Sequence, residues 1–182
     1  MQSSSTGKVM LVTGGSRGIG AEIARLAVRS GYRVVVSYAK NAIAAHALVE
    51  ELNTGRTVAH AIQCDVSDEA SVVRLFAAVT EIFGPVTVLG NNAGLTGGFS
   101  RVSDISAQTL AETMNTNVIG AFLCCREAVR QMSTQVGGVG GAIVNVSSRA
   151  SQYGGAGEWV HYAASKGAMD TLTLGLAREV AA

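Results

Sequence analysis

Two side chains near the end of the sequence, Tyr162 and Lys166, have the types and the spacing of a proton-transfer pair. Residues four apart lie one turn apart on the same face of a helix, so the phenol and the ammonium would lie side by side. A neighbouring ammonium favours a phenolate and lowers the pKa of a phenol from about 10 toward neutrality. Such a phenol can act as a general acid or base. The pair alone is a weak signal, because an exposed helix pair has the same spacing.

A glycine-rich stretch, residues 13–20, lies between an apolar run and a helical pattern. Its spacing is Gly14-x-x-x-Gly18-x-Gly20 rather than G-x-G-x-x-G. Glycines let the backbone approach a pyrophosphate, and the helix that follows directs free N–H groups and its positive dipole end at the anion. This arrangement favours dinucleotide binding over a plain tight turn. The predicted contacts are Gly14, Ser16, Arg17, Gly18, Ile19 and Gly20.

The end of the next apolar run, at Tyr38, bears on which dinucleotide binds. An enzyme that grips an unphosphorylated ribose usually has Asp or Glu there, about 20 residues beyond the glycines. Tyr38 and its neighbours Ser37 and Ala39 are neutral, so no carboxylate would repel a 2′-phosphate. Arg17, with Lys40 as a second candidate, could supply positive charge to that phosphate. We expect NADP(H) as the favoured cofactor and NAD(H) as the alternative.

Two further apolar runs end in polar residues, Asp65-Val66 in one case and Asn91-Asn92-Ala93-Gly94 in the other. A carboxylate can accept a hydrogen bond from an adenine amino group, and Asn side chains can hold turn backbones. Either group could equally be an ordinary turn or N-cap residue. These are weak signals on their own. The predicted cofactor contacts here are Asp65, Val66, Asn92, Ala93 and Gly94.

Short β-branched runs alternate with longer helical patterns along the chain. Strands are predicted over residues 8–13, 33–38, 57–64, 86–90 and 142–147. Helices are predicted over residues 18–31, 42–52, 68–83 with Ser67 as N-cap, 106–135 in one or two pieces, and from about 159 to the end. Such alternation predicts a parallel sheet covered on both faces, a Rossmann-type doubly wound α/β fold of three layers.

This fold binds ligands at the carboxyl ends of its strands. The glycine-rich stretch and the polar strand ends fall at that edge, as do Ser147 and Ser148 after the last strand. Tyr162 and Lys166 follow this serine-bearing strand end, so a catalytic role is favoured over an exposed helix pair.

The composition limits the classes of partner. With 182 residues the chain is expected to form one domain, residues 1–182, and 48% of its residues are apolar. A net charge of +1 predicts neither nucleic acid nor an anionic membrane as a partner. The sequence shows no signal peptide and no membrane-spanning apolar run, and its three cysteines are expected to be small buried hydrophobes in a reducing, cytoplasmic setting. The histidines lack metal-ligand spacing.

Together these residues resemble the short-chain dehydrogenase/reductase family, over about residues 8–182. The resemblance covers the glycine pattern, the adenine-site Asp65 and the Asn-Asn-Ala-Gly element at residues 91–94. It implies a catalytic tetrad of Asn117, Ser148, Tyr162 and Lys166. Ser147 competes with Ser148, and matching the strand at residues 141–146 favours Ser148.

The resemblance implies hydride transfer between NADPH and a small-molecule carbonyl or alcohol substrate. Tyr162 would exchange a proton with the substrate oxygen, Ser148 would hydrogen-bond that oxygen, and Lys166 would bind the nicotinamide ribose. Asn117 would hold a water that links Lys166 to solvent. The resemblance also implies a homo-oligomer, a dimer or a tetramer. Two alternatives stay open: a non-catalytic dinucleotide-binding sensor on the same fold and, further behind, a nucleoside-binding transferase.

Family members are usually longer, and the chain stops close after the helix that carries Lys166. We therefore expect the domain to lack its C-terminal strands and its substrate loop. The last predicted strand would then leave an apolar sheet edge exposed, which soluble proteins avoid. The substrate cannot be identified from the loops that are present.

Overall fold

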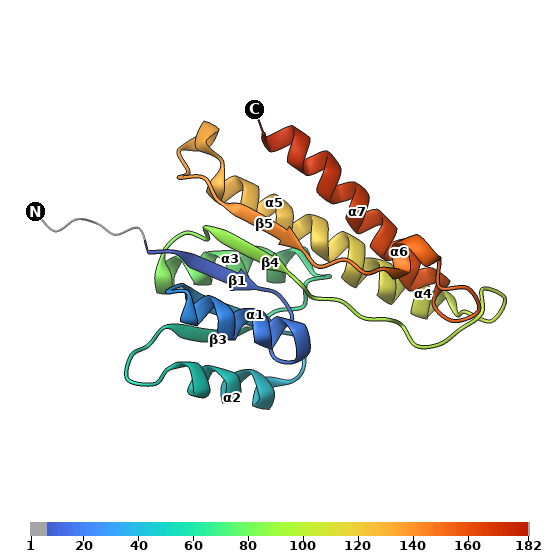
Figure 1. The fold of residues 1–182 in the computed structure, drawn as a ribbon, viewed down its shortest axis with the longest axis horizontal. Coiled ribbons are helices and arrows are strands. Elements are labelled where there is room, and N and C mark those ends of the chain that lie inside the picture. The colour runs from blue at the N-terminus through green and yellow to red at the C-terminus, as the bar shows by residue number, and fades with distance from the viewer. Residues whose placement is uncertain (1–6, 182) are drawn as a thin grey trace, which may run out of the picture.

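Five parallel strands form one sheet in the order β3-β2-β1-β4-β5 (Figure 1). The computed structural model describes residues 7–181. The strands are β1 (Val9–Val12), β2 (Arg33–Tyr38), β3 (Ala59–Gln63), β4 (Val88–Asn91) and β5 (Ala142–Asn145). Strand order reverses between β1 and β4, so the loops after these two strands diverge and leave a crevice at the carboxyl edge. The predicted doubly wound α/β fold is confirmed.

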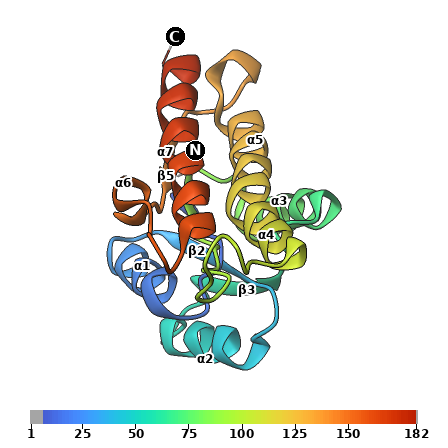
Figure 2. The same ribbon diagram turned by 90° about the vertical axis from the view of Figure 1, so that its right-hand side faces the viewer.

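Helices cover both faces of this sheet (Figure 2). One core cluster joins β1 and β2 to α1 (Gly18–Arg29) and α2 (Ala42–Leu52). The other joins the strands to α3 (Glu69–Phe83) and α5 (Gly120–Met132). The remaining helical elements are α4 (Ala107–Met114), η1 (Asn115–Ile119), η2 (Thr134–Val136), α6 (Ala150–Tyr153) and α7 (Val160–Val180).

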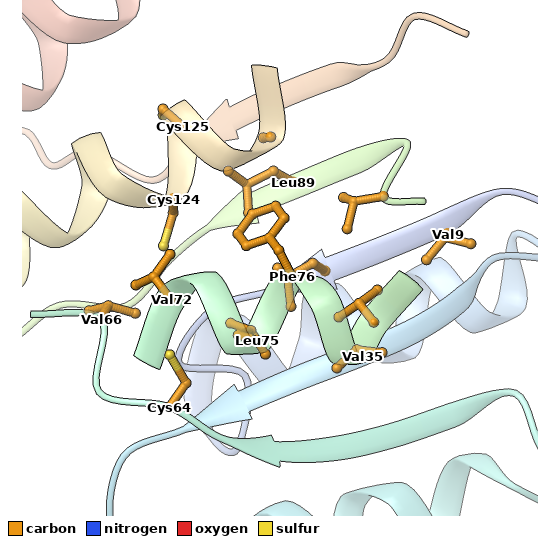
Figure 3. Packing of buried hydrophobic residues seen from close by; sticks show 14 of the residues in the cluster. Val9, Val35, Cys64, Val66, Val72, Leu75, Phe76, Leu89, Cys124 and Cys125 are labelled. Carbon is orange, nitrogen blue, oxygen red and sulfur yellow. The ribbon is translucent and has the colours of Figure 1, made fainter. Parts of the chain in front are cut away.

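The larger core cluster is centred on Phe76, which is 2% exposed (Figure 3). Its ring packs among strand residues that include Leu89. Cys64, Cys124 and Cys125 belong to the same cluster as free thiols. Burial raises the pKa of the Cys125 thiol to about 11, so the thiol stays protonated and unreactive at neutral pH. The prediction of buried, unpaired cysteines is confirmed.

Two local predictions need correction. Ser67 does not cap α3; the N-cap is Asp68, whose carboxylate accepts hydrogen bonds from Ala70 N and Ser71 N. Ser67 instead donates to the carboxylate of Asp65, at 2.7 Å from its hydroxyl. A carboxylate accepts two backbone N–H groups and also complements the helix dipole, which a serine hydroxyl does not.

The predicted helix over residues 106–135 is continuous through its centre, because a π-helical turn, η1, joins α4 to α5. The short helix α6 lies between the strand predicted over residues 142–147 and the helix predicted from about residue 159, where the sequence pattern predicts no element. Strand β5 pairs with β4 along one side, and Val144 on it is 55% exposed, in keeping with the predicted apolar edge. Between residues 7 and 181, no helix is long and apolar enough to cross a membrane.

Candidate active site

A cleft of about 900 Å³ lies at the carboxyl ends of the strands. This volume falls within the range of small-molecule sites. The structure brings together in it all twelve predicted cofactor contacts outside the proton-transfer pair. These are Gly14, Ser16, Arg17, Gly18, Ile19, Gly20, Tyr38, Asp65, Val66, Asn92, Ala93 and Gly94.

The glycine-rich loop is packed too closely for larger residues. Gly14 has a φ of +61°, and a Cβ on it would lie 2.9 Å from the Cα of Ala93. A Cβ on Gly20 would lie 2.6 Å from Asn92 Nδ2 and 2.7 Å from the carbonyl oxygen of Gly14. Gly14 and Gly20 thus lie directly against the end of β4, and this contact excludes a larger side chain at both positions.

The ends of β1 and β4 are joined by Thr13 and Asn92. The Thr13 hydroxyl oxygen accepts hydrogen bonds from Asn92 N and Ala93 N, each at 3.0 Å. Asn92 Nδ2 donates to the carbonyl oxygens of Thr13 and Gly14, at 3.0 and 3.1 Å. Both hydrogens of the Asn92 amide are therefore used to hold the crevice open at a fixed width. Thr13 belongs to the glycine-rich stretch of the sequence, but no contact is predicted for it. A Thr directly before the glycines is nonetheless a usable signal for a side chain that bonds to the backbone of a turn.

The backbone N–H groups of the first turn of helix α1 have no side-chain capping partner. Its N-cap, Arg17, makes no side-chain capping hydrogen bond, and the first turn contains no acidic residue. The positive end of the helix dipole therefore has no negative partner within the helix itself. Together with the close-packed glycines, this end of α1 fits the pyrophosphate of a dinucleotide.

We expect Gly20→Ala to lower the free energy of unfolding by about 1 to 3 kcal/mol, the usual cost of overpacking. Alanine is normally the better helix residue, so any loss must come from contact with Asn92 and Gly14. The matched control is Gly175→Ala in α7, where a Cβ would meet nothing within 4 Å. That variant should gain about 0.5 to 1 kcal/mol. Urea unfolding of both proteins checks the pair; a stabilised Gly20→Ala would contradict the packing argument.

Tyr162 and Lys166, the predicted proton-transfer pair, adjoin the cleft at Gly94, where an added Cβ would lie 3.7 Å from Lys166 Nζ. Lys166 is 4% exposed, and its Nζ lies 5.8 Å from the centre of the Tyr162 ring. Nζ donates one hydrogen bond, 2.7 Å long, to the carbonyl oxygen of Val146. Burial lowers the pKa of the Lys166 ammonium, and the charge of Asp170 partly opposes this. The expected side-by-side arrangement of the pair is confirmed.

Asn117 is fully buried on the π-helical turn η1. Its amide brackets the backbone of Leu95: Oδ1 accepts from Leu95 N and Nδ2 donates to Leu95 O, each at 2.8 Å. Nδ2 also donates to Ser165 Oγ at 2.9 Å. Asn117 therefore joins the segment after β4 to α7. π-helical turns often occur at functional sites, and this one turns Asn117 toward the helix that carries Tyr162.

The two serines after β5 differ in how their hydroxyls are used. Ser147 Oγ donates to the carbonyl oxygen of Lys166 at 3.3 Å. Ser148 Oγ accepts a hydrogen bond from Ala150 N at 3.1 Å and donates to no acceptor in residues 7–181. A hydroxyl with no acceptor of its own can donate a hydrogen bond to a substrate oxygen. This supports the choice of Ser148 over Ser147.

The segment after Gly94 also packs on the start of α7. Phe99 stacks on Trp159 with ring centres 4.5 Å apart, and Ser100 N donates to the carbonyl oxygen of Glu158 at 2.8 Å. A Cβ on Gly97 would lie 2.7 Å from Nε2 of His161. These contacts join residues more than 55 apart in the chain, so no local spacing signals them.

The chain matches the family model described as short chain dehydrogenase over residues 8–182. It is 49% identical over 174 residues to the uncharacterized oxidoreductase YgfF of Escherichia coli K12, and the aligned region covers 96% of this chain and 70% of that protein. It is 38% identical over 165 residues to versicolorin reductase 1 of Aspergillus parasiticus, covering 91% of this chain and 61% of the relative.

A crystal structure of a short chain dehydrogenase from Burkholderia cenocepacia J2315 in complex with NADP superimposes with a TM-score of 0.87. The two sequences are 35% identical, and the match covers 96% of this chain and 69% of the other. The chain therefore spans roughly two thirds of the length of these three proteins, between 61% and 70%.

Proposed function

Because this chain belongs to the short-chain dehydrogenase family, we propose that it is an NADP(H)-dependent oxidoreductase in which Tyr162 is the general acid or base. It would reduce a ketone or aldehyde, or oxidise a secondary alcohol. The observation that carries this proposal is the buried Lys166 ammonium beside Tyr162, at the wall of the cleft formed by Gly94. A charge is costly to bury, and a catalytic role accounts for that cost.

In the reducing direction, the bound cofactor supplies a hydride to the carbonyl carbon. Tyr162 donates its phenolic proton to the carbonyl oxygen, and the free hydroxyl of Ser148 donates a hydrogen bond to the same oxygen. The Lys166 ammonium then lies beside the phenolate that remains and stabilises its negative charge. Lys166 also has hydrogens left for the hydroxyls of the nicotinamide ribose, because the described contacts use only one of its three.

We propose two roles for Asn117: it would hold a water of the proton relay, and it positions the segment after β4 against α7. Both hydrogens of its amide are already donated, to Leu95 and Ser165. Its Oδ1 retains one lone pair beside the bond to Leu95, and a relay water would use that lone pair or the main-chain carbonyl. The side chain also holds the segment after β4 against α7, which keeps the cleft wall and Tyr162 in a fixed relation.

The preference for NADP(H) is supported by the residues around the adenosine end of the cleft. The wall after β2 is Ser37 to Asn41, which contains no carboxylate and includes Lys40. Arg17 lies across the same cleft. The related Burkholderia protein contains NADP in its crystal structure. A 2′-phosphate at this wall would meet Lys40 and Arg17, and no carboxylate from residues 37–41 would repel it.

Replacing Arg17 by Ala should weaken NADPH binding about tenfold and NADH binding less than twofold, since a charge-assisted hydrogen bond contributes about 1.5 to 3 kcal/mol. The matched control is Arg29→Ala, in the last turn of the same helix and away from the cleft. Fluorescence titration with both cofactors measures the difference. Equal losses for NADPH and NADH would contradict the assignment of Arg17 to the 2′-phosphate.

The sensor alternative is not favoured by any contact in the site, because a sensor has no use for a free Ser148 hydroxyl or for a buried ammonium next to Tyr162. Homo-oligomerisation stays a prediction of the family resemblance, and a cytoplasmic location stays a prediction of the cysteine usage and the N-terminal sequence.

A further inference from the structure

The segment that follows Gly94, residues 95–100, runs along the start of α7, and the two lie together beside α4 and α6 (Figure 1). Three contacts hold it there, and each successive contact falls on an earlier residue of α7 or of the loop before it. They are Leu95 to Ser165 through Asn117, Gly97 to His161, and Ser100 N to the carbonyl oxygen of Glu158. Tyr162 falls between the first and second of these contacts, so the segment borders the proposed proton donor.

The far end of this segment carries an aromatic pair in which Phe99 stacks on Trp159, with the ring planes at 28°. The carbonyl oxygen of Trp159 accepts from Ala163 N at 2.8 Å, which closes the helical turn that contains Tyr162. Trp159 precedes Tyr162 by three residues, and helical side chains lean toward the N-terminus, so the phenol is directed toward the pair. Three residues of helix rise about 4.5 Å, a distance that a ring bonded directly to a ketone carbon can span.

The pair carries two costs that packing alone does not explain. Phe99 is 73% exposed, so most of its apolar ring lies in water. The indole Nε1 of Trp159 is buried and, within residues 7–181, has no hydrogen-bond partner. An aliphatic side chain would fill the same space without an unpaired N–H. A flat ligand ring on Phe99 would take that side chain out of water, so ligand binding accounts for an aromatic pair at this place.

We propose that Phe99, held in place by Trp159, is an aromatic platform for a flat ring of the substrate, and that the substrates are aryl ketones or the matching aryl alcohols. This inference rests on the proposed function. The ring would stack on Phe99 while the carbonyl bonded to it reaches the Tyr162 phenol and the Ser148 hydroxyl. Offset stacking of two aromatic faces contributes beyond the burial of apolar area, and a puckered ring cannot make this contact.

Two ketones of equal size test the platform. Acetophenone and cyclohexyl methyl ketone have the same carbonyl group and the same number of carbon atoms, and they differ in a flat against a puckered ring. The ratio of their kcat/KM values is compared between variants, because their intrinsic difference in reactivity then cancels. We expect Phe99→Leu to lower the ratio of aryl to cyclohexyl about fivefold. Phe99→Tyr, which keeps the flat face, should retain the wild-type ratio.

The matched control is Phe122→Leu. Phe122 lies in α5, is 50% exposed and does not line the cleft. This variant loses an exposed phenyl ring of the same kind at a different place, so it should keep the wild-type ratio of the two ketones.

A second measurement does not depend on turnover. Trp159 is the only tryptophan of the chain, so its fluorescence reports directly on the platform. The protein is saturated with NADPH, which cannot oxidise an alcohol, and is titrated with 1-phenylethanol or 1-cyclohexylethanol. The phenyl alcohol should shift the emission of Trp159 and bind about fivefold more tightly than the cyclohexyl alcohol. In Phe99→Leu the two affinities should become equal.

Equal affinities of the two alcohols for the wild-type protein would overturn the platform, as would a full aryl preference in Phe99→Leu shown to be folded by circular dichroism. If the phenyl alcohol binds preferentially but no ketone is reduced, the proposed function fails and the platform stands. If both ketones are reduced and Phe99→Leu leaves their ratio unchanged, the proposed function stands and the platform fails.

Discussion

Tyr162→Phe is expected to lower kcat about a thousandfold, because general acid catalysis typically contributes 10² to 10⁴. The variant removes one oxygen and keeps the ring that lies beside the Lys166 ammonium. NADPH affinity should stay within about twofold, since the twelve predicted cofactor contacts in the cleft are unchanged. Steady-state kinetics together with direct cofactor titration measures both quantities.

The matched control is Tyr32→Phe, which removes the phenol oxygen of a ring next to Lys8 at the amino ends of β1 and β2, the sheet edge opposite the cleft. It should leave kcat and cofactor affinity at wild-type values. If Tyr162→Phe also keeps wild-type turnover, Tyr162 is not the proton donor. If it loses turnover and cofactor affinity in equal measure, its role is binding rather than proton transfer.

Lys166→Met is expected to lower kcat about a hundredfold or more and to change the free energy of unfolding by less than about 1 kcal/mol. The ammonium is desolvated, so its removal relieves an electrostatic cost, while the carbonyl of Val146 loses its hydrogen bond; the two effects are similar in size and opposite in sign. Methionine fills a comparable volume. Kinetics and urea unfolding measure the two effects separately.

The pH dependence of stability has a definite sign. Burial lowers the pKa of Lys166 in the folded protein, so the unfolded chain binds its proton more tightly. The charged lysine therefore destabilises the fold below the folded pKa, and this penalty fades as the pH rises toward the unfolded value of about 10.4. Lys166→Met should lack that pH-dependent increment, whereas Lys8→Met, at a distant position, should retain it. A large loss of stability in Lys166→Met at neutral pH would show that the ammonium is mainly structural.

Local spacing was enough to predict much of the site. The glycines of residues 13–20 follow a buried strand and precede a helix, and Tyr162 and Lys166 are one helical turn apart. Each of these patterns has a geometric consequence within a few residues. The parallel sheet then brings the strand ends to one edge, and the cleft there is lined by the twelve predicted cofactor contacts other than Tyr162 and Lys166.

The rest of the site depends on contacts between distant parts of the chain. Thr13 bonds to Asn92, 79 positions away, and Asn117 bonds to Ser165, 48 positions away. A hydrogen bond of this kind has no periodicity to detect. The π-helical turn at residues 115–119 also escapes prediction, because its residues are compatible with an ordinary helix.

Hydride transfer itself provides the most direct test. The purified protein is incubated with NADPH deuterated at the transferable position and with a panel of aryl ketones, cyclic ketones and 3-oxoacyl thioesters, and the products are weighed by mass spectrometry. The account predicts an alcohol one mass unit heavier than its unlabelled counterpart from at least one member of the panel, and none from Tyr162→Phe in the same time. Tight NADPH binding with no deuterium in any product would contradict catalysis and favour a dinucleotide sensor.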